Sequence, residues 1–312
     1  MRRPIVVVGS VNLDLVATSL RVPAAGETIT GQDFATFSGG KGANQAVGVA
    51  RLDHPVSMIA KVGNDAFGTQ LKHALRDAGV DVRAVATAKG SSGVALINIG
   101  ADGQNSIVVV PGANGQMRPS DVRKNAPLLQ RAGMILAQLE IPLEALEALG
   151  AFAQRHKIPF MLDPAPARVL PASLLECVTW ITPNESETRI LCGLDADEPV
   201  TPSTAARCAE LLLARGPQNV IIKMGAQGAF LATATGDRQM SKAFPMTAVD
   251  TTAAGDAFNA GFAVSLLEGK NALEAARYAA AVAAISVTRK GAQASMPSAR
   301  EVKAFLQAAA KS

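Results

Sequence analysis

The chain has 312 residues, of which 48% are hydrophobic and 4% are aromatic, a length and composition that suit one α/β enzyme domain with an aliphatic core. Its net charge of +4 comes without a dense basic run, and no apolar segment reaches the roughly 18 residues of a membrane span, so we expect neither nucleic acid nor a membrane as a partner. The three cysteines (Cys177, Cys192 and Cys208) form no CxxC pair or disulfide framework, which is typical of a reducing cytoplasm.

The first predicted element is a short buried strand in PIVVVGS, residues 4–10. Asn12 and Asp14 come just after it, and strand alternation points their side chains the same way. An amide beside a carboxylate suits the neighbouring hydroxyl groups of a sugar. A pair that only stabilises the loop explains these two residues equally well.

The glycine-rich segment SGGKGANQAVG, residues 38–48, opens a predicted helix over 42–52. Its spacing is neither that of a phosphate-binding P-loop nor that of the GxGxxG dinucleotide fingerprint. The glycines allow a ligand to come close to the backbone, while Lys41 and Asn44 offer donors to hydroxyls or phosphate. Taken alone, this segment indicates a binding loop of no particular class.

Short apolar runs then alternate with helical patterns. The runs are SMIAKVG, GMILAQLE, IPFMLDP, VTWITPN and NVIIKMG, and helices are predicted over 143–156 and 201–216. This order predicts a single α/β domain, residues 1–312, with a parallel sheet covered by helices on both faces. Two insertions, near 13–36 and 92–112, read instead as strands, with a hairpin around Asp102 and Gly103. We expect them to form a small separate sheet that acts as a lid.

Polar or glycine residues close four of the predicted strands: Glu140, Asp163, Asn184 and Gly225. Each alone is compatible with ordinary turn chemistry. Because ligands of open α/β sheets bind beyond the carboxyl ends of the strands, we expect these four positions to converge on one crevice.

The stretch DTTAAGDAFNAG, from Asp250 to Gly261, precedes and opens another predicted helix. Asp256 is expected at or near its N-cap, which a capping role would explain. Capping does not explain the three small residues before it. Ala253, Ala254 and Gly255 are expected to leave their backbone amides open, and such a helix N-terminus attracts phosphate.

In TPNESE, Asn184 and Glu187 have the spacing of a helix capping box. The same pair could hold a hydrated Mg²⁺ near phosphates, since magnesium keeps several of its waters. The histidines (His54, His73 and His156) have no ligand spacing and there is no GxSxG elbow, so a zinc site or a hydrolase triad is a poor candidate.

The motifs GGKGANQA, DPAPAR, TPNE, DTTAAGD and VTRKGAQ resemble, as a set, those of the ribokinase/PfkB family of carbohydrate kinases. The resemblance runs from Gly9 to Pro297. It implies a ribokinase-like three-layer α/β fold with a β lid, a homodimer formed through that lid, and ATP-dependent transfer of phosphate to the 5-hydroxyl of D-ribose.

The resemblance also implies a role for each matching position. Asp256 resembles the base that takes the proton of the sugar hydroxyl, and the amides of Ala253, Ala254 and Gly255 resemble the anion hole. The expected sugar contacts are Asn12, Asp14, Gly40, Lys41, Asn44 and Glu140. The expected ATP contacts are Asn184, Lys223, Gly225, Ala226, Gln227 and Gly228, with Glu187 on Mg²⁺ through water. An activating K⁺ would be held mainly by backbone carbonyls of Asp250, Thr252, Ser286, Arg289, Gly291 and Ser295.

Two positions depart from the family pattern. Lys223 stands where a threonine is frequent, and Asp163 stands where asparagine is expected before PAPAR. We expect the Asp163 change to alter one hydrogen bond without touching the core of the mechanism. Three readings of the activity stay open: a kinase for ribose, a kinase for deoxyribose, another sugar or a nucleoside, and a non-catalytic sugar-binding regulator. Retention of Gly255 and Asp256 argues against the regulator.

Overall fold

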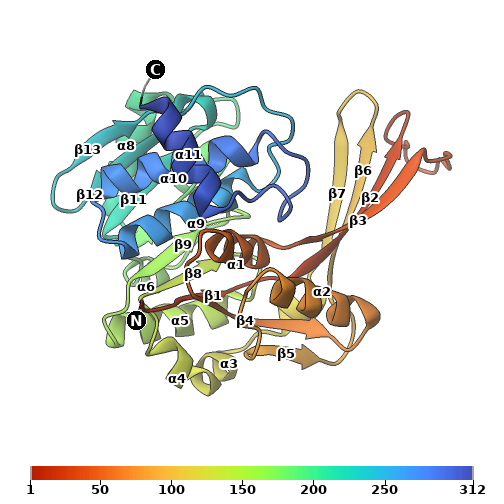
Figure 1. The fold of residues 1–312 in the computed structure, drawn as a ribbon, viewed down its shortest axis with the longest axis horizontal. Coiled ribbons are helices and arrows are strands. Elements are labelled where there is room, and N and C mark those ends of the chain that lie inside the picture. Colours follow the sequence, from red (N-terminus) through yellow and green to blue (C-terminus); the bar gives the residue numbers. More distant parts are fainter. Residues whose placement is uncertain (1, 311–312) are drawn as a thin grey trace.

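The structure is a computed structural model that describes residues 2–310, and it confirms the predicted three-layer α/β fold with a separate small sheet (Figure 1). The main sheet in these residues has nine strands in the order β13-β12-β11-β10-β9-β8-β1-β4-β5. Its strands run parallel from β5 to β11, whereas β12 and β13 are antiparallel at one edge, where the sequence analysis expected a parallel sheet. The strands are β1 (Ile5–Val8), β4 (Val56–Gly63), β5 (Val85–Ala88), β8 (Met134–Gln138), β9 (Phe160–Asp163), β10 (Trp180–Ile181), β11 (Asn219–Lys223), β12 (Ala229–Thr233) and β13 (Arg238–Ser241).

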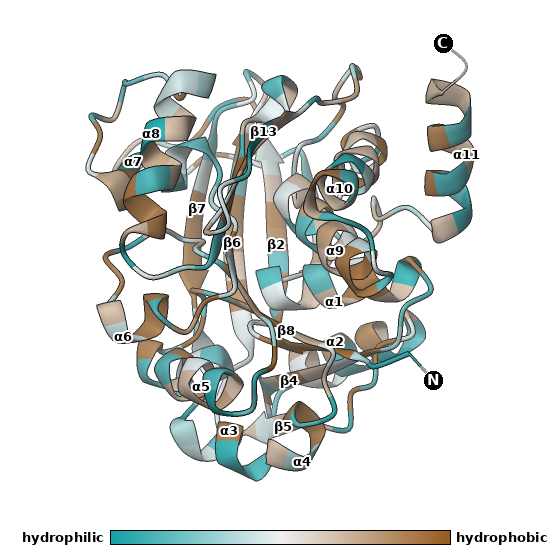
Figure 2. Ribbon diagram, turned by 90° about the vertical axis from the view of Figure 1, so that its left-hand side faces the viewer, coloured by the Kyte–Doolittle hydropathy of each residue, from teal (hydrophilic) through white to brown (hydrophobic). Residues whose placement is uncertain are grey.

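Helices cover both faces of this sheet (Figure 2). One face carries α1 (Lys41–Arg51), α2 (Ala66–Asp77), α9 (Ala254–Leu267), α10 (Ala272–Ser286) and α11 (Ala299–Ala309). The other carries α3 (Pro119–Lys124), α4 (Ala126–Leu129), α5 (Leu143–Arg155), α6 (Ala172–Leu175), α7 (Glu185–Cys192) and α8 (Pro202–Leu213). Two short 3-10 turns, η1 (Gly112–Gln116) and η2 (Gly225–Gln227), complete the described elements.

The hydrophobic core consists of two clusters, one on each face of the sheet. Strand alternation divides the side chains between them: Ile5 and Val7 belong to the first cluster, Val6 and Val8 to the second. Because both faces of the sheet are covered, the central strand β1 is apolar at every position and reads as an uninterrupted run of valine and isoleucine.

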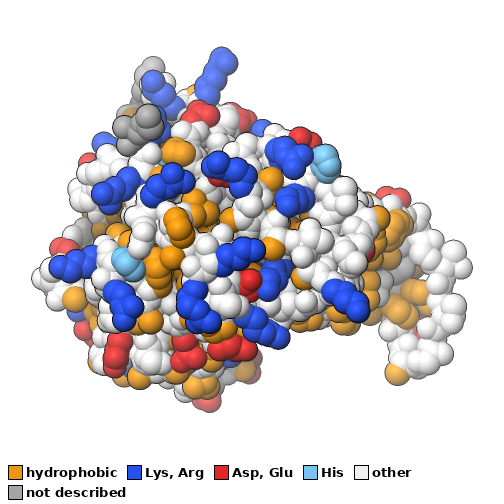
Figure 3. Space-filling view, turned by 90° about the horizontal axis from the view of Figure 1, so that it is seen from below, with side chains coloured by type: hydrophobic (Ala, Val, Ile, Leu, Met, Phe, Trp, Pro, Cys, Tyr) orange, Lys and Arg blue, Asp and Glu red, His pale blue; other side chains and the backbone are white. Residues whose placement is uncertain are grey.

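The second sheet confirms the prediction of a small sheet built from two insertions. Its order is β3 (Asp33–Gly39), β2 (Asn12–Ser19), β6 (Gly93–Gly100) and β7 (Asn105–Val110). The β6–β7 hairpin turns at Asp102 and Gly103 as predicted, with Gly103 at a φ of 81° that favours glycine. In Figure 1 these four strands project from the main body, and in Figure 3 the projecting part carries hydrophobic side chains. We call this sheet the lid.

The carboxyl ends of the parallel strands share one edge of the main sheet, and α1 and α9 begin there. β10 is only two residues long, and the chain after it stays beside both neighbouring strands, since the Thr182 amide donates to the Leu162 carbonyl and the Lys223 amide to the Pro183 carbonyl. Among the described residues, no helix has the length and apolar character needed to cross a membrane.

Candidate active site

Asp256 is the third residue of α9, near the N-cap as predicted, but its side chain does not cap the helix, so the alternative of a capping aspartate does not hold. The N-cap is Ala253, which adopts the left-handed conformation (φ 59°), and no side chain caps the helix. The buried Asp256 carboxylate turns toward α1 instead. It accepts hydrogen bonds from Asn44 Nδ2 at Oδ2 and from Gln45 Nε2 at Oδ1, each at 3.0 Å.

Of the three backbone amides before Asp256, two have no hydrogen-bond acceptor among the described residues. The amide of Ala254 donates to the carbonyl of Thr251 at 3.2 Å, contrary to the expectation that all three would be open. The amides of Ala253 and Gly255 have no acceptor among residues 2–310. Both residues are half-buried, so an anion can reach this turn from solvent. The helix N-terminus therefore retains unpaired donors of the kind that bind phosphate.

The pKa of Asp256 is raised to about 6. Burial is the largest cause and the nearby Asp163 adds to it, while Lys41 and the two amide donors act in the opposite direction. A carboxylate with this pKa is ionised at neutral pH and is a stronger base than an exposed aspartate.

The glycine-rich segment brings the N-terminus of α1 against the β1–β2 connection. Gly40 has a φ of 89°, and a Cβ there would lie 2.8 Å from the amide nitrogen of Asn12. This close approach lets the Lys41 amide donate to Glu140 Oε2 at 3.1 Å, an oxygen that also accepts from the Ser10 hydroxyl. The missing side chain of Gly40 thus lets α1 approach the β1–β2 connection, and a contact between Gly40 and the sugar stays a prediction.

The Lys41 ammonium lies among carboxylates. Although burial opposes it, the charges of Asp256, Asp163, Glu140 and Glu187 raise the pKa of Lys41 above its usual range. Lys41 therefore stays protonated and offsets part of the negative charge of the cluster.

Asn12 and Asp14 lie within lid strand β2 and, two residues apart, share one of its faces as predicted. The side-chain Nδ2 of Asn114 donates to Asn12 Oδ1 at 2.7 Å. Burial, with a smaller contribution from Glu140, raises the pKa of Asp14 to about 6. Gly39 leaves room for this carboxylate, because a Cβ there would lie 2.3 Å from Asp14 Oδ2.

Asp163 and Lys223 form a buried ion pair between the ends of β9 and β11, with Nζ 3.0 Å from Oδ1. The other oxygen of Asp163 accepts from Gln45 Nε2 at 3.0 Å, the same nitrogen that donates to Asp256. One side-chain amide therefore joins Asp163 to the predicted base, which is consistent with the expectation that Asp163 lies among the strand-end residues of the site.

Sequence reasoning assigned no role to Ser10, Gln45, Asn114 or Gln138, all of which hold predicted site residues or one another. Gln45 is the most consequential, and Gln138 Nε2 in turn donates to its Oε1 at 2.7 Å. One signal was present: Lys41, Asn44 and Gln45 fall at helical spacing on one side of an otherwise small and apolar helix.

Asn184 and Glu187 form the predicted capping box of α7. Glu187 accepts from the Asn184 amide at 2.7 Å and from its side-chain Nδ2 at 3.0 Å. Burial is the main cause that raises the pKa of Glu187. With both oxygens already accepting, Glu187 suits a Mg²⁺ ion held through water better than a directly bound one.

The remaining predicted nucleotide segment is the turn between β11 and β12. Gly225, Ala226 and Gln227 are exposed there, and Gly228 follows with a φ of 99°. Lys223 pairs with Asn184 in an isolated β-bridge, which places this turn next to the start of α7. Its side chain points inward to Asp163, in contrast to the exposed residues that follow.

The residues predicted to hold a monovalent cation lie in two adjoining loops. Asp250 Oδ1 accepts from the Thr252 amide at 2.9 Å, and Oδ2 from the Gly291 amide at 2.8 Å. Burial opposes ionisation of Asp250, but these donors outweigh it and lower its pKa. The carbonyls of Thr252, Gly291 and Ser295 accept no hydrogen bond from the described residues, so they suit a cation with oxygen ligands. Ser286 fits less well because its carbonyl accepts from Arg289, whose side chain pairs with Glu301.

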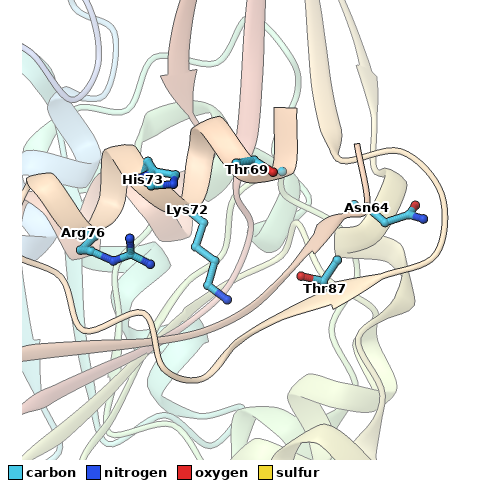
Figure 4. Close-up of a pocket in the computed structure, with 8 residues that line it drawn as sticks. Asn64, Thr69, Lys72, His73, Arg76 and Thr87 are labelled. Carbon is cyan, nitrogen blue, oxygen red and sulfur yellow. The ribbon is translucent and has the colours of Figure 1, made fainter. Parts of the chain in front are cut away.

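Two surface hollows of the described chain lie elsewhere. One, of about 190 Å³, is bounded by α2 and the ends of β4 and β5, with Lys72, His73, Arg76 and Thr87 around it (Figure 4). The other, of about 360 Å³, lies between α6 and the end of α8. Neither contains a predicted site residue.

The three-layer fold, the small separate sheet and a buried carboxylate beside unpaired amides at a helix N-terminus are together the features of a sugar kinase. The model of the pfkB family of carbohydrate kinases matches residues 2–299. A ribokinase of Haemophilus influenzae is 40% identical over 98% of this chain and 99% of its own, and a deoxyribokinase of Salmonella typhi is 37% identical over 97% and 98%. A solved structure of Arabidopsis thaliana ribokinase complexed with ribose and ATP has a TM-score of 0.93 at 34% identity, covering 98% of this chain and 99% of that one. The chain therefore belongs to the pfkB family of carbohydrate kinases.

Proposed function

We propose that the protein transfers the terminal phosphoryl group of ATP to the 5-hydroxyl of D-ribose. The observation that carries the proposal is the Asp256 carboxylate, buried and held by Asn44 and Gln45 beside the unpaired amides at the start of α9. Phosphoryl transfer depends mainly on positioning and charge stabilisation. This arrangement supplies both, together with a base for the acceptor hydroxyl.

In the proposed reaction, Asp256 takes the proton from the sugar hydroxyl as that oxygen attacks phosphorus. The amides of Ala253 and Gly255 and the dipole of α9 stabilise the charge on the transferred group without reorganising. Ala254 contributes through its small size, because its amide already donates to Thr251. The lid is positioned to exclude water from the reacting atoms.

The sugar contacts of the proposal are Asn12, Asp14, Gly40, Lys41, Asn44 and Glu140, alongside Asp256. Asn44 Oδ1 supports this assignment: it is buried and has no hydrogen-bond partner among the described residues, so it is free to accept from a hydroxyl. Asp14, on the lid, would close over the sugar from the opposite side of the site.

The nucleotide lies, in this proposal, along Asn184, Lys223 and the turn from Gly225 to Gly228. Glu187 would hold Mg²⁺ through water, and Mg²⁺ would neutralise charge on the phosphates when bound. Asp250 with the carbonyls of Thr252, Gly291 and Ser295 would hold K⁺ beneath the anion hole, and Ser286 and Arg289 complete the loop. A cation there would stiffen the turn that carries Ala253.

The lid offers a surface for a second copy of the chain. By register, Phe34, Leu96 and Val108 lie on the lid face opposite Asp14, and they are 63%, 44% and 56% exposed. An apolar sheet face of this kind is a protein interface more often than a solvent surface. We infer a homodimer formed through this face. Three free cysteines support a reducing, cytoplasmic location.

Deoxyribose is the second candidate substrate, because a deoxyribokinase is among the close relatives. A panel of D-ribose, 2-deoxy-D-ribose, hexoses and nucleosides, ranked by kcat/KM with ATP and Mg²⁺, tests the proposal. D-ribose should rank first. A nucleoside or hexose in first place, or no transfer to any sugar, would overturn it, and the last outcome would favour the non-catalytic regulator.

A further inference from the structure

Lys223 is a buried ammonium with incomplete hydrogen bonding. The residue is 9% exposed, and its Nζ makes one hydrogen bond within the described chain, to Asp163 Oδ1 at 3.0 Å. An ammonium carries three donors, so two remain unfilled. Leaving charged donors unfilled in a buried position is costly, which indicates that something outside the protein completes them.

The unfilled donors lie beside the open end of α9. A Cβ built on Gly255 would be 3.3 Å from Lys223 Nζ, a tight contact that would displace the ammonium by a few tenths of an ångström, so the ammonium lies close to the helix N-terminus. The amide of Gly255 is itself unpaired. An anion at this point would meet a full positive charge and a helix dipole together.

Asp163 holds that ammonium and is also joined to the predicted base. Its Oδ1 pairs with Lys223, and its Oδ2 accepts from Gln45, whose Nε2 also donates to Asp256. Gln45 is fixed in turn by Gln138. The base and the ammonium are thus set by one side-chain network.

We propose that Lys223 is a catalytic residue that binds the transferred phosphoryl group directly, and that Asp163 is a positioning residue that acts through it. The inference rests on the proposed function and deepens it, from a general nucleotide contact to a contact with the terminal phosphate. Asp163 directs the Lys223 ammonium toward Gly255. Gln45, which donates to both Asp163 and Asp256, fixes the position of the proposed base relative to the ammonium.

A binding experiment tests the Lys223 contact without any sugar. Calorimetry compares Mg²⁺ complexes of ADP and of a non-hydrolysable ATP analogue for the wild type, Lys223→Met and the control Lys303→Met. Lys303 is an exposed residue of α11. In Lys223→Met the analogue should lose about 10-fold or more in affinity while ADP changes little. Equal losses for both nucleotides, or no loss, would overturn the contact.

Kinetics test the positioning role. Lys223→Met should lower kcat by about 10²- to 10³-fold, the range for removal of one transition-state donor, with a small change in the sugar KM. Asp163→Asn should also lower kcat, and the double variant should be no slower than Lys223→Met, because both residues act as one unit. The double variant contains no unpaired buried charge, so it serves if a single variant does not fold. If the fold loss of kcat in the double variant equals the product of the two single losses, the positioning role of Asp163 is overturned. A kcat of Asp163→Asn near that of the wild type would overturn it too.

A pH profile separates this role from a structural one. The negative charge of Asp163 favours the protonated form of Asp256, so Asp163→Asn should move the acidic limb of kcat/KM to lower pH. A limb that stays in place, with only the melting temperature changed, would contradict the coupling. If the wild type transfers no phosphate to ribose, the proposed function fails, whereas the nucleotide comparison still decides the Lys223 contact.

Discussion

Asn44 Nδ2 lies 3.0 Å from Asp256 Oδ2, a hydrogen bond that spans 212 positions of sequence and joins the start of α1 to the start of α9. The residue beside it, Gln45, donates to the other oxygen of the same carboxylate. Neutral amides orient Asp256 while burial keeps its pKa high. The geometry of these two helix starts therefore sets both the direction and the basicity of the proposed base.

The pH dependence of the reaction follows from that basicity. The pKa of Asp256 is raised to about 6 from an ordinary value of 3.8, so the base becomes protonated, and inactive, as pH falls through about 6. We expect kcat at saturating ribose to fall about tenfold per pH unit below that point. The value of kcat/KM should fall more steeply, because the pKa of Asp14, a proposed sugar contact, is also raised to about 6. Initial rates at saturating ATP, measured from about pH 5 to 9, give the profile. A profile that stays flat down to about pH 5 would contradict the raised pKa of the base.

The sugar site should depend on Asp14 and on the glycine that makes room for it. Asp14→Asn is expected to raise the sugar KM by about 10- to 100-fold, because hydrogen bonds to a charged group are worth about 1.5–3 kcal/mol. Gly39→Ala should raise it too without changing charge, since the new Cβ would press on Asp14 Oδ2. Gly115→Ala, where a Cβ meets only ordinary contacts, is the control. A normal sugar KM in both site variants would remove Asp14 from the site.

The two loops proposed to hold K⁺, around Thr252 and Gly291, lead to a separate prediction. Replacing K⁺ with tetramethylammonium, which is too large for a carbonyl cage, should lower kcat by about 5- to 150-fold, the usual range of coupling between sites. Asp250→Asn should weaken this dependence, because its carboxylate ties the Thr252 and Gly291 loops together. The measurement is kcat against K⁺ concentration at constant ionic strength. Equal rates in both salts would remove the cation from the mechanism.

Much of the frame could be predicted from the sequence. Apolar runs alternating with helical patterns predicted the sheet and its two helical layers, because buried parallel strands are apolar on both faces. The capping box of Asn184 and Glu187 could also be predicted, since two residues three positions apart carry the whole signal. The strand ends at Glu140, Asp163, Asn184 and Gly225 marked the correct edge of the sheet.

What escaped prediction depends on contacts between distant segments. Gln45 acquires its role only when α1 packs beside α9, and no local pattern encodes that approach. The sequence placed Asp256 at or near the start of α9, but it did not show that Ala253 would be the N-cap in a left-handed conformation, which leaves Asp256 third in the helix. The Asp163–Lys223 pair joins two strands separated by β10, so each residue read alone looked like an isolated departure.

The proposed dimer can be tested on the lid. Val108→Lys, on the lid face opposite Asp14, should shift the mass measured by light scattering from that of two chains to that of one, since a lysine in an apolar interface is left uncompensated. Val169→Lys is the matched control, because Val169 is 85% exposed and lies outside the lid. A wild type that is monomeric throughout, or a Val108→Lys variant that remains a dimer, would contradict assembly through this face.

The most direct test of the central claim is the identity of the product made with and without the proposed base. Wild type and Asp256→Asn are incubated with ATP, Mg²⁺, K⁺ and D-ribose, and phosphorus NMR reads the coupling of the new phosphate to neighbouring protons. We predict ribose 5-phosphate, coupled to the two protons at C5, from the wild type. Asp256→Asn should turn over about 10²- to 10⁴-fold more slowly while still binding ribose. Phosphate at another position, no transfer by the wild type, or near-normal turnover by Asp256→Asn would contradict the account.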